Sequence, residues 1–540
     1  MATDRTVTPG GSWLGRWFRL WSALRSSPRL FAFLLGGVCV FGFAPFDQFG
    51  ATAVPPAPTL VCISLGGLFL LWRDASVRQA AERGLAWGAG FFLGGVSWIY
   101  VSLSQFSGMA PPLAALATLL FCLYLALFPA LAGAAFAYFR SSRNHDIALF
   151  GGLWMLSEWL RGTLFTGFPW LAVGYSQSPP SPLAGFAPIL GVYGVGFLVA
   201  LCSAGLASAL VNKEHRRITA IALLTVLSMG WLLRGIEWTS PVGKPLSVSL
   251  LQGNVPQSVK WDPQRLWLSV DRYVSLAQRN PATLTVLPET ALPLFFSEVP
   301  QEMLDDLTRH GQVILGIPIG TRGGGYSNGA ILLPAQRTAS EESRPAEKAI
   351  DKALPAYAKR HLVPFGEFAP PGFDWFFRLA QIPFSSFTAG ATRQPAFLVG
   401  EQRIAANICY EDLFGEELLT GLNEATLLLN LSNTAWFGDS LAQPQHLQIA
   451  RLRALETGRV MLRATNTGMT AMILPNGQVA AMLTPFSAGA LTVSAQGYQG
   501  LTPYARWGNL FALLLAVIAI IACLPAWRAR RLQRSGRPTR

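Results

Sequence analysis

Long apolar runs are the feature of this sequence that most restricts what it can fold into. Seven of them follow one another in the first half of the chain, and an eighth lies near its C-terminal end. Each is close to the ~20 residues that a helix needs to cross a bilayer, although the first is short. The runs cover residues 30–46, 52–72, 85–103, 111–138, 147–163, 187–211, 217–234 and 508–526. The sequence therefore predicts a polytopic α-helical membrane domain of about eight spans.

The composition supports this prediction. Only 13% of the 540 residues are charged and 51% are hydrophobic, whereas a soluble domain carries about 25% charged residues. The formal net charge is +13, but the basic residues form short clusters beside the apolar runs rather than one basic face. No recognised nucleic-acid-binding module accompanies them. We therefore expect the chain to work in a bilayer, with no nucleic-acid partner.

The basic clusters also predict the orientation of the spans, because lysine and arginine gather in cytoplasmic loops. They lie before the first run, between the second and third, after the fourth, after the sixth and after the last, whereas the loops at 47–51 and 104–110 have none. Both termini are therefore predicted to be cytoplasmic. The expected organisation is a membrane domain at 1–238, an outer domain at 239–505, and a final span with a basic tail at 506–540. In a bacterial inner (plasma) membrane the outer face is the periplasm.

Two segments beside the runs carry aromatic side chains. Residues 1–29 interleave tryptophans with arginines, and no small-residue cleavage site follows the first run. This pattern is typical of a segment on the membrane surface rather than of a cleavable signal peptide. The loop after the fifth run, at 167–171 and 174–177, mixes glycine and proline with aromatics. Composition leaves two interpretations open, an aromatic belt at the headgroup level or a loop that contacts a lipid or the outer domain.

The outer region, 239–505, has a different pattern. Short β-type runs lie at 246–251, 283–287, 313–317, 330–333, 404–408, 426–431, 460–465 and 470–474. Helical periodicity appears between some of them, at 265–279 and at 443–457, where Ile449, Leu452 and Leu455 share one face. The alternation of strands and helices predicts one large layered α/β domain. Residues 336–352 are polar and predict an exposed insert or the tip of a hairpin.

Cysteine usage singles out one residue. Five of the six cysteines lie inside apolar runs, and only Cys409 lies in the outer region. It has no partner there for a disulfide and no CxxC spacing for a metal. It ends the short apolar run at 404–408 and is followed by Tyr410, Glu411 and Asp412. A cysteine becomes a nucleophile when a neighbouring base or positive charge favours its thiolate.

Three predicted strand ends carry residues with chemical potential. Glu289 follows the run at 283–287, Lys359 begins the stretch 359–367, and Cys409 follows the run at 404–408. A carboxylate near a thiol can take its proton, and a lysine can stabilise both the thiolate and the oxyanion that forms when the thiol attacks a carbonyl. Together the three residue types are sufficient for acyl transfer through a thioester.

The order Glu289, Lys359, Cys409 in an α/β domain resembles the nitrilase, or carbon–nitrogen hydrolase, superfamily. Within it, the chain resembles the integral-membrane apolipoprotein N-acyltransferase family. The resemblance covers nearly the whole length, through the eight runs, the loop at 166–175, and motifs at 252–254, 260–262, 361–367, 409–411 and 433–438. It implies an αββα nitrilase-like sandwich next to the membrane domain. No metal or cofactor is expected.

The resemblance also implies roles for single residues. Cys409 would be the nucleophile, Glu289 the general base, and Lys359 the group that stabilises the tetrahedral intermediate. Glu367 would support the lysine and the catalytic glutamate. The positions that match the family's pattern around the site are Tyr410, Glu411 and Trp261, although for each a plain pocket-wall role stays open.

The implied reaction has two steps. Cys409 takes an acyl chain from a phospholipid, with phosphatidylethanolamine expected as the donor, and passes it to the N-terminal α-amino group of the diacylglyceryl-cysteine of an apolipoprotein. Because both substrates lie in the outer leaflet, the site is expected at membrane level. Mobile apolar loops would keep water from the thioester. Phe295–Phe296 and the stretch 373–387 are candidates for such loops or for ordinary core. We expect a monomer.

Two alternative functions remain at this point. A membrane-tethered amidase or nitrilase would use the same three residues with water in the second step, but a tether needs one span rather than eight. A transporter with an accessory domain would carry ionisable residues inside several spans. Here Glu158 and Arg161 lie together at one end of the fifth run, and the span interiors are otherwise nearly free of such residues.

Overall fold

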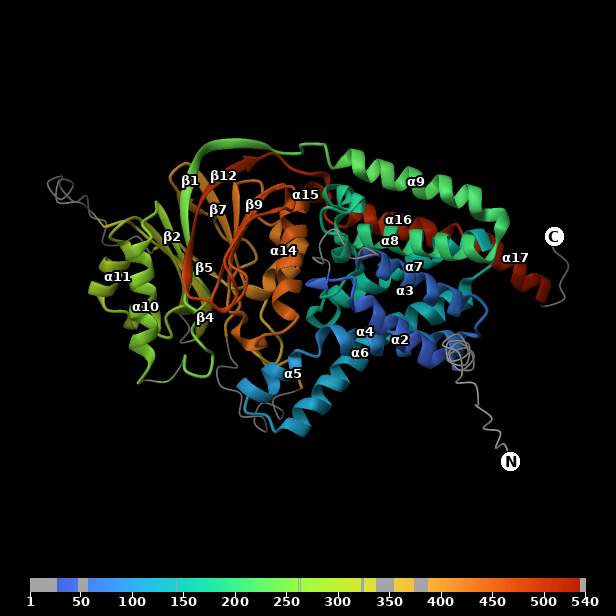
Figure 1. Cartoon of the computed structure of the whole chain (residues 1–540), viewed down its shortest axis with the longest axis horizontal. Helices are drawn as coiled ribbons and strands as arrows, with labels where there is room; N and C mark the ends of the chain where they lie inside the picture. The colour runs from blue at the N-terminus through green and yellow to red at the C-terminus, as the bar shows by residue number, and fades with distance from the viewer. Residues whose placement is uncertain are drawn as a thin grey trace, which may run out of the picture.

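The computed structural model describes residues 27–46, 57–141, 143–260, 262, 264–321, 325–336, 354–372 and 387–534. Apolar helices gather on one side of the molecule and β-strands on the other, with helix α14 (Ala442–Thr457) between them (Figure 1). The predicted surface segment at 1–29 and the polar insert at 336–352 lie almost wholly outside the described residues.

A helix is present at every predicted apolar run. These helices are α2 (Pro28–Val40), α3 (Ala57–Arg73), α4 (Val77–Val96), α6 (Pro111–Phe139), α7 (Arg143–Thr163), α8 (Ala187–Val211), α9 (Arg216–Leu233) and α16 (Leu510–Ile521), which α17 (Leu524–Arg534) follows. Short turns α5 (Ile99–Val101) and η2 (Ser102–Phe106) continue α4.

The number of spans is only partly settled by helix length and composition. Within the described residues, four helical segments are long and apolar enough to cross a membrane, and α4 with its continuation makes a fifth across a bend of 58°. Helix α2 has only 13 residues, and α7 carries four charged side chains, Arg143, Asp146, Glu158 and Arg161. The chain is therefore a membrane protein with several apolar helices, and the count of eight stays a prediction.

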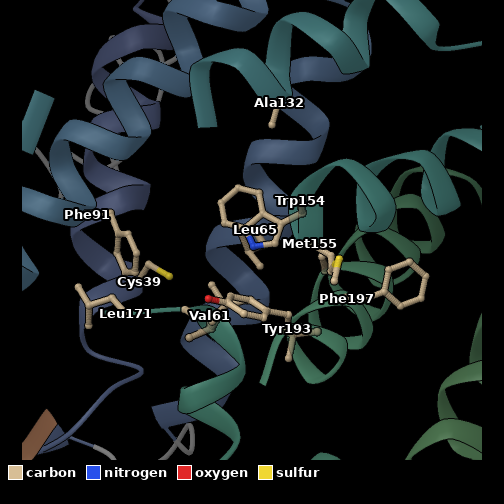
Figure 2. Close-up of a cluster of buried hydrophobic side chains, with 14 of the residues drawn as sticks. Cys39, Val61, Leu65, Phe91, Ala132, Trp154, Met155, Leu171, Tyr193 and Phe197 are labelled. Atoms are coloured by element: carbon tan, nitrogen blue, oxygen red, sulfur yellow. The ribbon is translucent and has the colours of Figure 1, made fainter. Parts of the chain in front are cut away.

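The helices pack closely through small residues. A side chain on Gly36 of α2 would come within 2.0 Å of the Trp87 carbonyl, and one on Gly90 of α4 within 2.0 Å of the Phe33 carbonyl. Glycine thus lets the two backbones touch, as is common where membrane helices associate. Larger side chains from α2, α3, α4, α7 and α8 fill the space between the helices, and Leu171 reaches the same cluster from the loop after α7 (Figure 2).

The outer region forms two six-stranded sheets. The first has the order β12-β1-β2-β3-β4-β5, and the second β11-β10-β9-β8-β7-β6. The strands of the first sheet are β1 (Ser240–Gln252), β2 (Leu284–Leu287), β3 (Gln312–Gly320), β4 (Tyr326–Leu333), β5 (Ala356–Ala358) and β12 (Gly489–Gln499). Those of the second are β6 (Phe397–Val399), β7 (Gln402–Ile408), β8 (Leu427–Ser432), β9 (Val460–Thr465), β10 (Ala471–Ile473) and β11 (Val479–Met482).

The two sheets face each other across an apolar core, to which both contribute, for example Val248 and Val286 from one and Leu429 and Leu462 from the other. Helices α10 (Leu266–Arg279) and α11 (Gln301–Thr308) cover the outer face of the first sheet. Helix α14 and the short α13 (Gly415–Leu418) cover the second. The predicted αββα nitrilase-like sandwich is confirmed.

Helix α14 belongs to both halves of the molecule. Its Leu447, Ala450 and Ala454 pack in the core against the second sheet, whereas Ile449 and Leu452 pack in the core of the helix bundle. The predicted face of α14 thus points at the membrane helices. The sandwich is joined to the bundle through a helix that is buried on both sides.

A buried ion pair reinforces this contact. Helix α8 is interrupted at Gly191, whose φ is +66°. The next amide, Val192 N–H, donates to Glu456 Oε1 of α14 at 2.6 Å, and Arg453 pairs with the same carboxylate at 3.0 Å. A carboxylate at the start of a helical segment is favourable, because the free N–H groups carry partial positive charge. Glu456 therefore fixes α14 against the break in α8.

Candidate active site

The three residues predicted at strand ends come together between the ends of the two sheets. Glu289 follows β2 and Lys359 follows β5 in the first sheet, whereas Cys409 follows β7 in the second. Lys359 Nζ lies 3.8 Å from Glu289 Oε1, and the charges of both residues act on the Cys409 thiol. All three side chains are buried, so their interactions are only weakly screened by water.

Glu289 is held by two hydrogen bonds. Asn328 Nδ2 of β4 donates to Oε1 at 2.7 Å, and the backbone N–H of Asn433 donates to Oε2 at 2.7 Å. Asn328 Nδ2 also donates a hydrogen bond to Glu367 Oε1, at 3.0 Å. One amide thus bridges two carboxylates and fixes their separation. Asn328 was not predicted from the sequence, because it lies just before the β-type run predicted at 330–333 and no local pattern marks it.

Lys359 lies between the same two carboxylates. Its Nζ donates to Glu367 Oε1 at 2.8 Å, and its side chain is only 1% exposed. Burial alone would lower the pKa of this ammonium, but Glu367 and Glu289 outweigh that effect and raise it. Lys359 therefore carries a fixed positive charge beside the thiol. Glu367 is in turn held by the Val363 amide at 2.8 Å.

Cys409 occupies a constrained turn. Its φ is +53°, in the left-handed region that side chains other than glycine rarely adopt. Asn430 Nδ2 donates to its carbonyl at 3.1 Å. Burial and the Glu289 carboxylate raise the pKa of the Cys409 thiol to about 12, in spite of Lys359. The Cys409 thiol therefore keeps its proton at neutral pH unless a base removes it.

Comparison with known proteins identifies the family. Residues 35–205 match the family model of the apolipoprotein N-acyltransferase N-terminal domain, and residues 247–503 match that of the carbon-nitrogen hydrolases. A relative from Nitrosomonas europaea, named apolipoprotein N-acyltransferase, is 46% identical over 513 residues, which cover 93% of this chain and 98% of the relative.

The chain belongs to the apolipoprotein N-acyltransferase family.

A further family member, from Ralstonia nicotianae, is 44% identical over 481 residues, covering 86% of this chain and 88% of its own. Among solved structures, an amidase from Nesterenkonia sp. overlaps 50% of this chain and 96% of its own, at 17% identity and a TM-score of 0.34. The family predicted from the sequence is confirmed by the two family members from Nitrosomonas europaea and Ralstonia nicotianae, which match over 98% and 88% of their own length.

In this member of the apolipoprotein N-acyltransferase family, Glu411 connects two parts of the site. Its Oε1 accepts from the backbone amides of Arg360 and His361, at 2.7 and 3.1 Å. Its Oε2 accepts from Ile408 N–H at 2.6 Å and from the Tyr357 hydroxyl at 2.8 Å. Glu411 therefore holds the segment of Lys359 against the turn of Cys409. These four hydrogen bonds fix the Glu411 carboxylate between the two segments.

Tyr410 connects the site to the membrane half. Its hydroxyl donates to the Gly167 carbonyl at 2.9 Å, and its ring stacks on Phe168. Trp170 Nε1, from the same loop, donates to Gln445 Oε1 of α14 at 2.7 Å. Of the two interpretations of this loop, contact with the outer domain therefore holds for Phe168 and Trp170. Phe165, just before the loop, is 84% exposed instead.

A buried network behind Cys409 was not predicted as part of the site. Asp412 accepts from His446 Nε2 at 2.6 Å and pairs with Arg463 at 2.5 Å. Burial opposes ionisation of Asp412, but His446 and Arg463 outweigh it and lower the pKa of this carboxyl. Burial lowers the pKa of His446 in spite of Asp412. This network ties the turn of Cys409 to α14 and β9.

The structure describes only some of the remaining candidates. Trp261 lies outside the described residues, as does the stretch 373–386 from the predicted apolar loops. Phe387 is described, and its amide donates to the Glu367 carbonyl at 3.0 Å. Phe296 packs against the core on the outer face of the first sheet, which favours a core role, whereas Phe295 packs on Tyr326.

Proposed function

We propose that this enzyme transfers a fatty acyl chain from a phospholipid to the N-terminal α-amino group of the diacylglyceryl-cysteine of apolipoproteins, through a thioester on Cys409. Phosphatidylethanolamine is the proposed donor. The observation that carries this proposal is the buried group of Glu289, Lys359 and Cys409, set on a sandwich that packs directly on apolar helices. N-acylation of lipoproteins also agrees with the family to which the chain belongs.

The first step moves one proton from thiol to alcohol. Glu289 takes the proton of Cys409 Sγ, and the sulfur attacks the ester carbonyl of the phospholipid. Lys359 stabilises the oxyanion of the tetrahedral intermediate. The carbon–oxygen bond then breaks, Glu289 returns its proton to the glycerol oxygen, and the lysophospholipid leaves. A thioester remains on Cys409.

The second step uses the amine as nucleophile. The free α-amino group attacks the thioester carbonyl, Lys359 again stabilises the oxyanion, and the carbon–sulfur bond breaks. A proton of the amine passes through Glu289 to Cys409 Sγ, so that the thiol is regenerated. The thioester is reactive enough to form the amide without ATP. In this scheme Glu367, Tyr410, Glu411 and Trp261 support the reacting groups.

We place the catalytic sandwich on the periplasmic side of a bacterial inner membrane. The domain limits proposed from the sequence, 1–238, 239–505 and 506–540, and the eight spans agree with this placement. Exposed apolar side chains on α6, α9 and α16, such as Leu131, Ile218 and Ile518, suit contact with lipid tails. Both substrates are lipid-anchored, so they would reach the site from the outer leaflet. The enzyme is proposed to act as a monomer, without a nucleic-acid partner.

Hydrolysis is the alternative that the same residues could support, because water could replace the amine in the second step. Burial of the nucleophile and the close contact with the bundle favour acyl transfer, since both restrict water at the thioester. A transporter with an accessory domain has less support, because it gives no role to the catalytic group.

Mass spectrometry of the purified, full-length enzyme tests this function. After incubation with phosphatidylethanolamine, the peptide that contains Cys409 should gain one fatty-acyl mass, which neutral hydroxylamine removes and which Cys409→Ser lacks. Adding a diacylglyceryl-cysteine peptide should discharge the adduct onto the peptide amine. Equal discharge by water alone would support the hydrolase, and no adduct with any phospholipid would refute the assignment of the nucleophile.

A further inference from the structure

Lys260 is a buried lysine beside the site that the proposed reaction does not use. It ends the turn that follows β1, and it is only 2% exposed. Among the described residues, its Nζ has no hydrogen-bond partner. Burial lowers the pKa of this ammonium to about 8, although the Glu289 carboxylate has the opposite effect and raises it. Lys260 therefore lies close enough to Glu289 for the two charges to interact.

The turn of Lys260 is fixed to the same residue that holds Glu289. Asn433 donates its backbone N–H to Glu289 Oε2 and its Nδ2 to Gln257 Oε1 in the turn, at 2.9 Å. Asn466 holds the start of this segment through Val255 N–H, at 2.9 Å. The position of Lys260 relative to Glu289 is thus set by hydrogen bonds rather than by a flexible loop.

The charges around Glu289 do not balance without Lys260. Among the described residues, the ionisable groups that face it are Lys359 after β5, Glu367 across the Asn328 bridge, Cys409 after β7, and Lys260 after β1. Two carboxylates share the single ammonium of Lys359, and that ammonium hydrogen-bonds Glu367 rather than Glu289. An uncompensated charge in a buried site is costly, and a carboxyl group escapes that cost by binding a proton.

We propose that Lys260 is a positioning residue that supplies the second positive charge of the site and keeps Glu289 ionised, so that it can accept the proton of Cys409. This inference rests on the proposed function. With Lys260 charged, two ammonium groups balance two carboxylates at rest. When the Cys409 proton moves to Glu289, the same two ammonium groups balance Glu367 and the thiolate. These five residues together thus stay neutral before and after the transfer.

The test measures how the rate of thioester formation on Cys409 depends on pH. Full-length enzyme is mixed with saturating phosphatidylethanolamine between pH 5.5 and 9. Lys260→Met removes the charge and keeps the length of the side chain, and an apolar group is tolerated at a buried position. We expect the acid limb of the profile, where the rate falls with decreasing pH, to move to higher pH by about one unit, which is a loss of about tenfold on the limb itself. Above pH 8 the two rates should converge, because Lys260 then loses its own proton.

Two matched variants control the test. Lys260→Arg keeps the charge and should keep the wild-type acid limb. Lys244→Met removes the same charge from an exposed position on β1 and should leave the whole profile unchanged.

The alternative outcomes are distinct. An equal loss at every pH, with the acid limb in place, would overturn the proposal and leave Lys260 as a support of its turn. A higher KM for the lipid without a shift of the limb would overturn it in favour of substrate binding. If wild-type enzyme forms no thioester at any pH, the proposed function itself fails, and this shows before any variant is compared.

Discussion

The hydroxyl of Tyr410 donates a hydrogen bond to the backbone carbonyl of Gly167, at 2.9 Å and across 243 positions of sequence. Tyr410 is the neighbour of Cys409, the proposed nucleophile, and Gly167 lies in the loop that follows α7. The turn that carries Cys409 is thus positioned by the membrane half as well as by its own sheet. The geometry of the site therefore depends on how the two halves are packed.

Tyr410→Phe tests this dependence. The change removes one hydrogen bond and leaves a buried carbonyl without a donor, which costs about 1–3 kcal/mol. We expect thioester formation to slow by about tenfold and the melting temperature in detergent to fall. Tyr100→Phe, on an exposed ring of α5, is the control and should change neither. An unchanged rate in Tyr410→Phe would mean that the loop does not position the turn.

Asn328→Ala should disturb both carboxylates at once. Without the bridging amide, Glu289 and Glu367 lose a donor and repel each other, so that Glu289 binds a proton more readily. We expect thioester formation to fall by about 10- to 100-fold at neutral pH, with less loss at higher pH. Asn328→Asp should be more damaging, because it adds a third carboxylate. Asn423→Ala, at an exposed position, should have no effect, and a loss in Asn328→Ala that does not vary with pH would contradict this explanation.

The buried network of Asp412, His446 and Arg463 predicts sensitivity to acid. His446 has a lowered pKa, so the unfolded chain binds a proton at a higher pH than the folded one. As pH falls below about 6.5, protonation favours unfolding, and stability decreases. Asp412, whose pKa is also lowered, adds to the loss at lower pH, when its carboxylate is finally protonated.

His446→Gln checks this prediction. Melting temperatures in detergent from pH 7.5 to 5.5 should fall less steeply for the variant than for wild type, because the titrating group is gone. His310→Gln, at an exposed position, should keep the wild-type slope. If His446→Gln and wild type lose stability in parallel, His446 is not the group that titrates.

Glu456→Gln should weaken the contact between the two halves. It leaves the Arg453 guanidinium buried without its counter-charge, which typically costs about 3–5 kcal/mol. We expect a clear fall in melting temperature and a parallel loss of acyl transfer. Glu424→Gln breaks an exposed pair with Arg393 and should cost less than about 1 kcal/mol. Equal effects of the two changes would argue against a docking role for Glu456.

Much of the architecture follows from local sequence patterns. Each predicted β-run is a strand, because alternating or continuous apolar residues need a sheet to bury them. Glu289, Lys359 and Cys409 could be singled out as candidates because each directly follows such a run, and the structure brings them together. The strands that were missed are β5, β6, β11 and β12. Three of these are only three or four residues long, and the pairing of β12 with β1 joins the two ends of the domain, which no local pattern reveals.

Other parts of the site depend on contacts between distant segments. Asp412 contacts His446 and Arg463, which lie 34 and 51 residues away in the sequence. The sequence around His446 or Arg463 gives no sign of this contact. The role of Asn328 depends on two carboxylates that come from other loops. The membrane helices show a related limit. Helix α7 has 21 residues but carries four charges, so its composition alone does not show whether it spans the membrane.

The burial of α14 on both sides means that the enzyme cannot be divided at its apparent domain boundaries. A fragment cut out at 239–505 would present Ile449, Leu452 and Leu455 to water as an apolar stripe, and such stripes promote aggregation. It would also lose the loop that holds Tyr410. Inhibitor screens and crystallisation therefore require the complete protein in detergent or lipid, and amino-acid changes in α14 are constrained on every face of the helix.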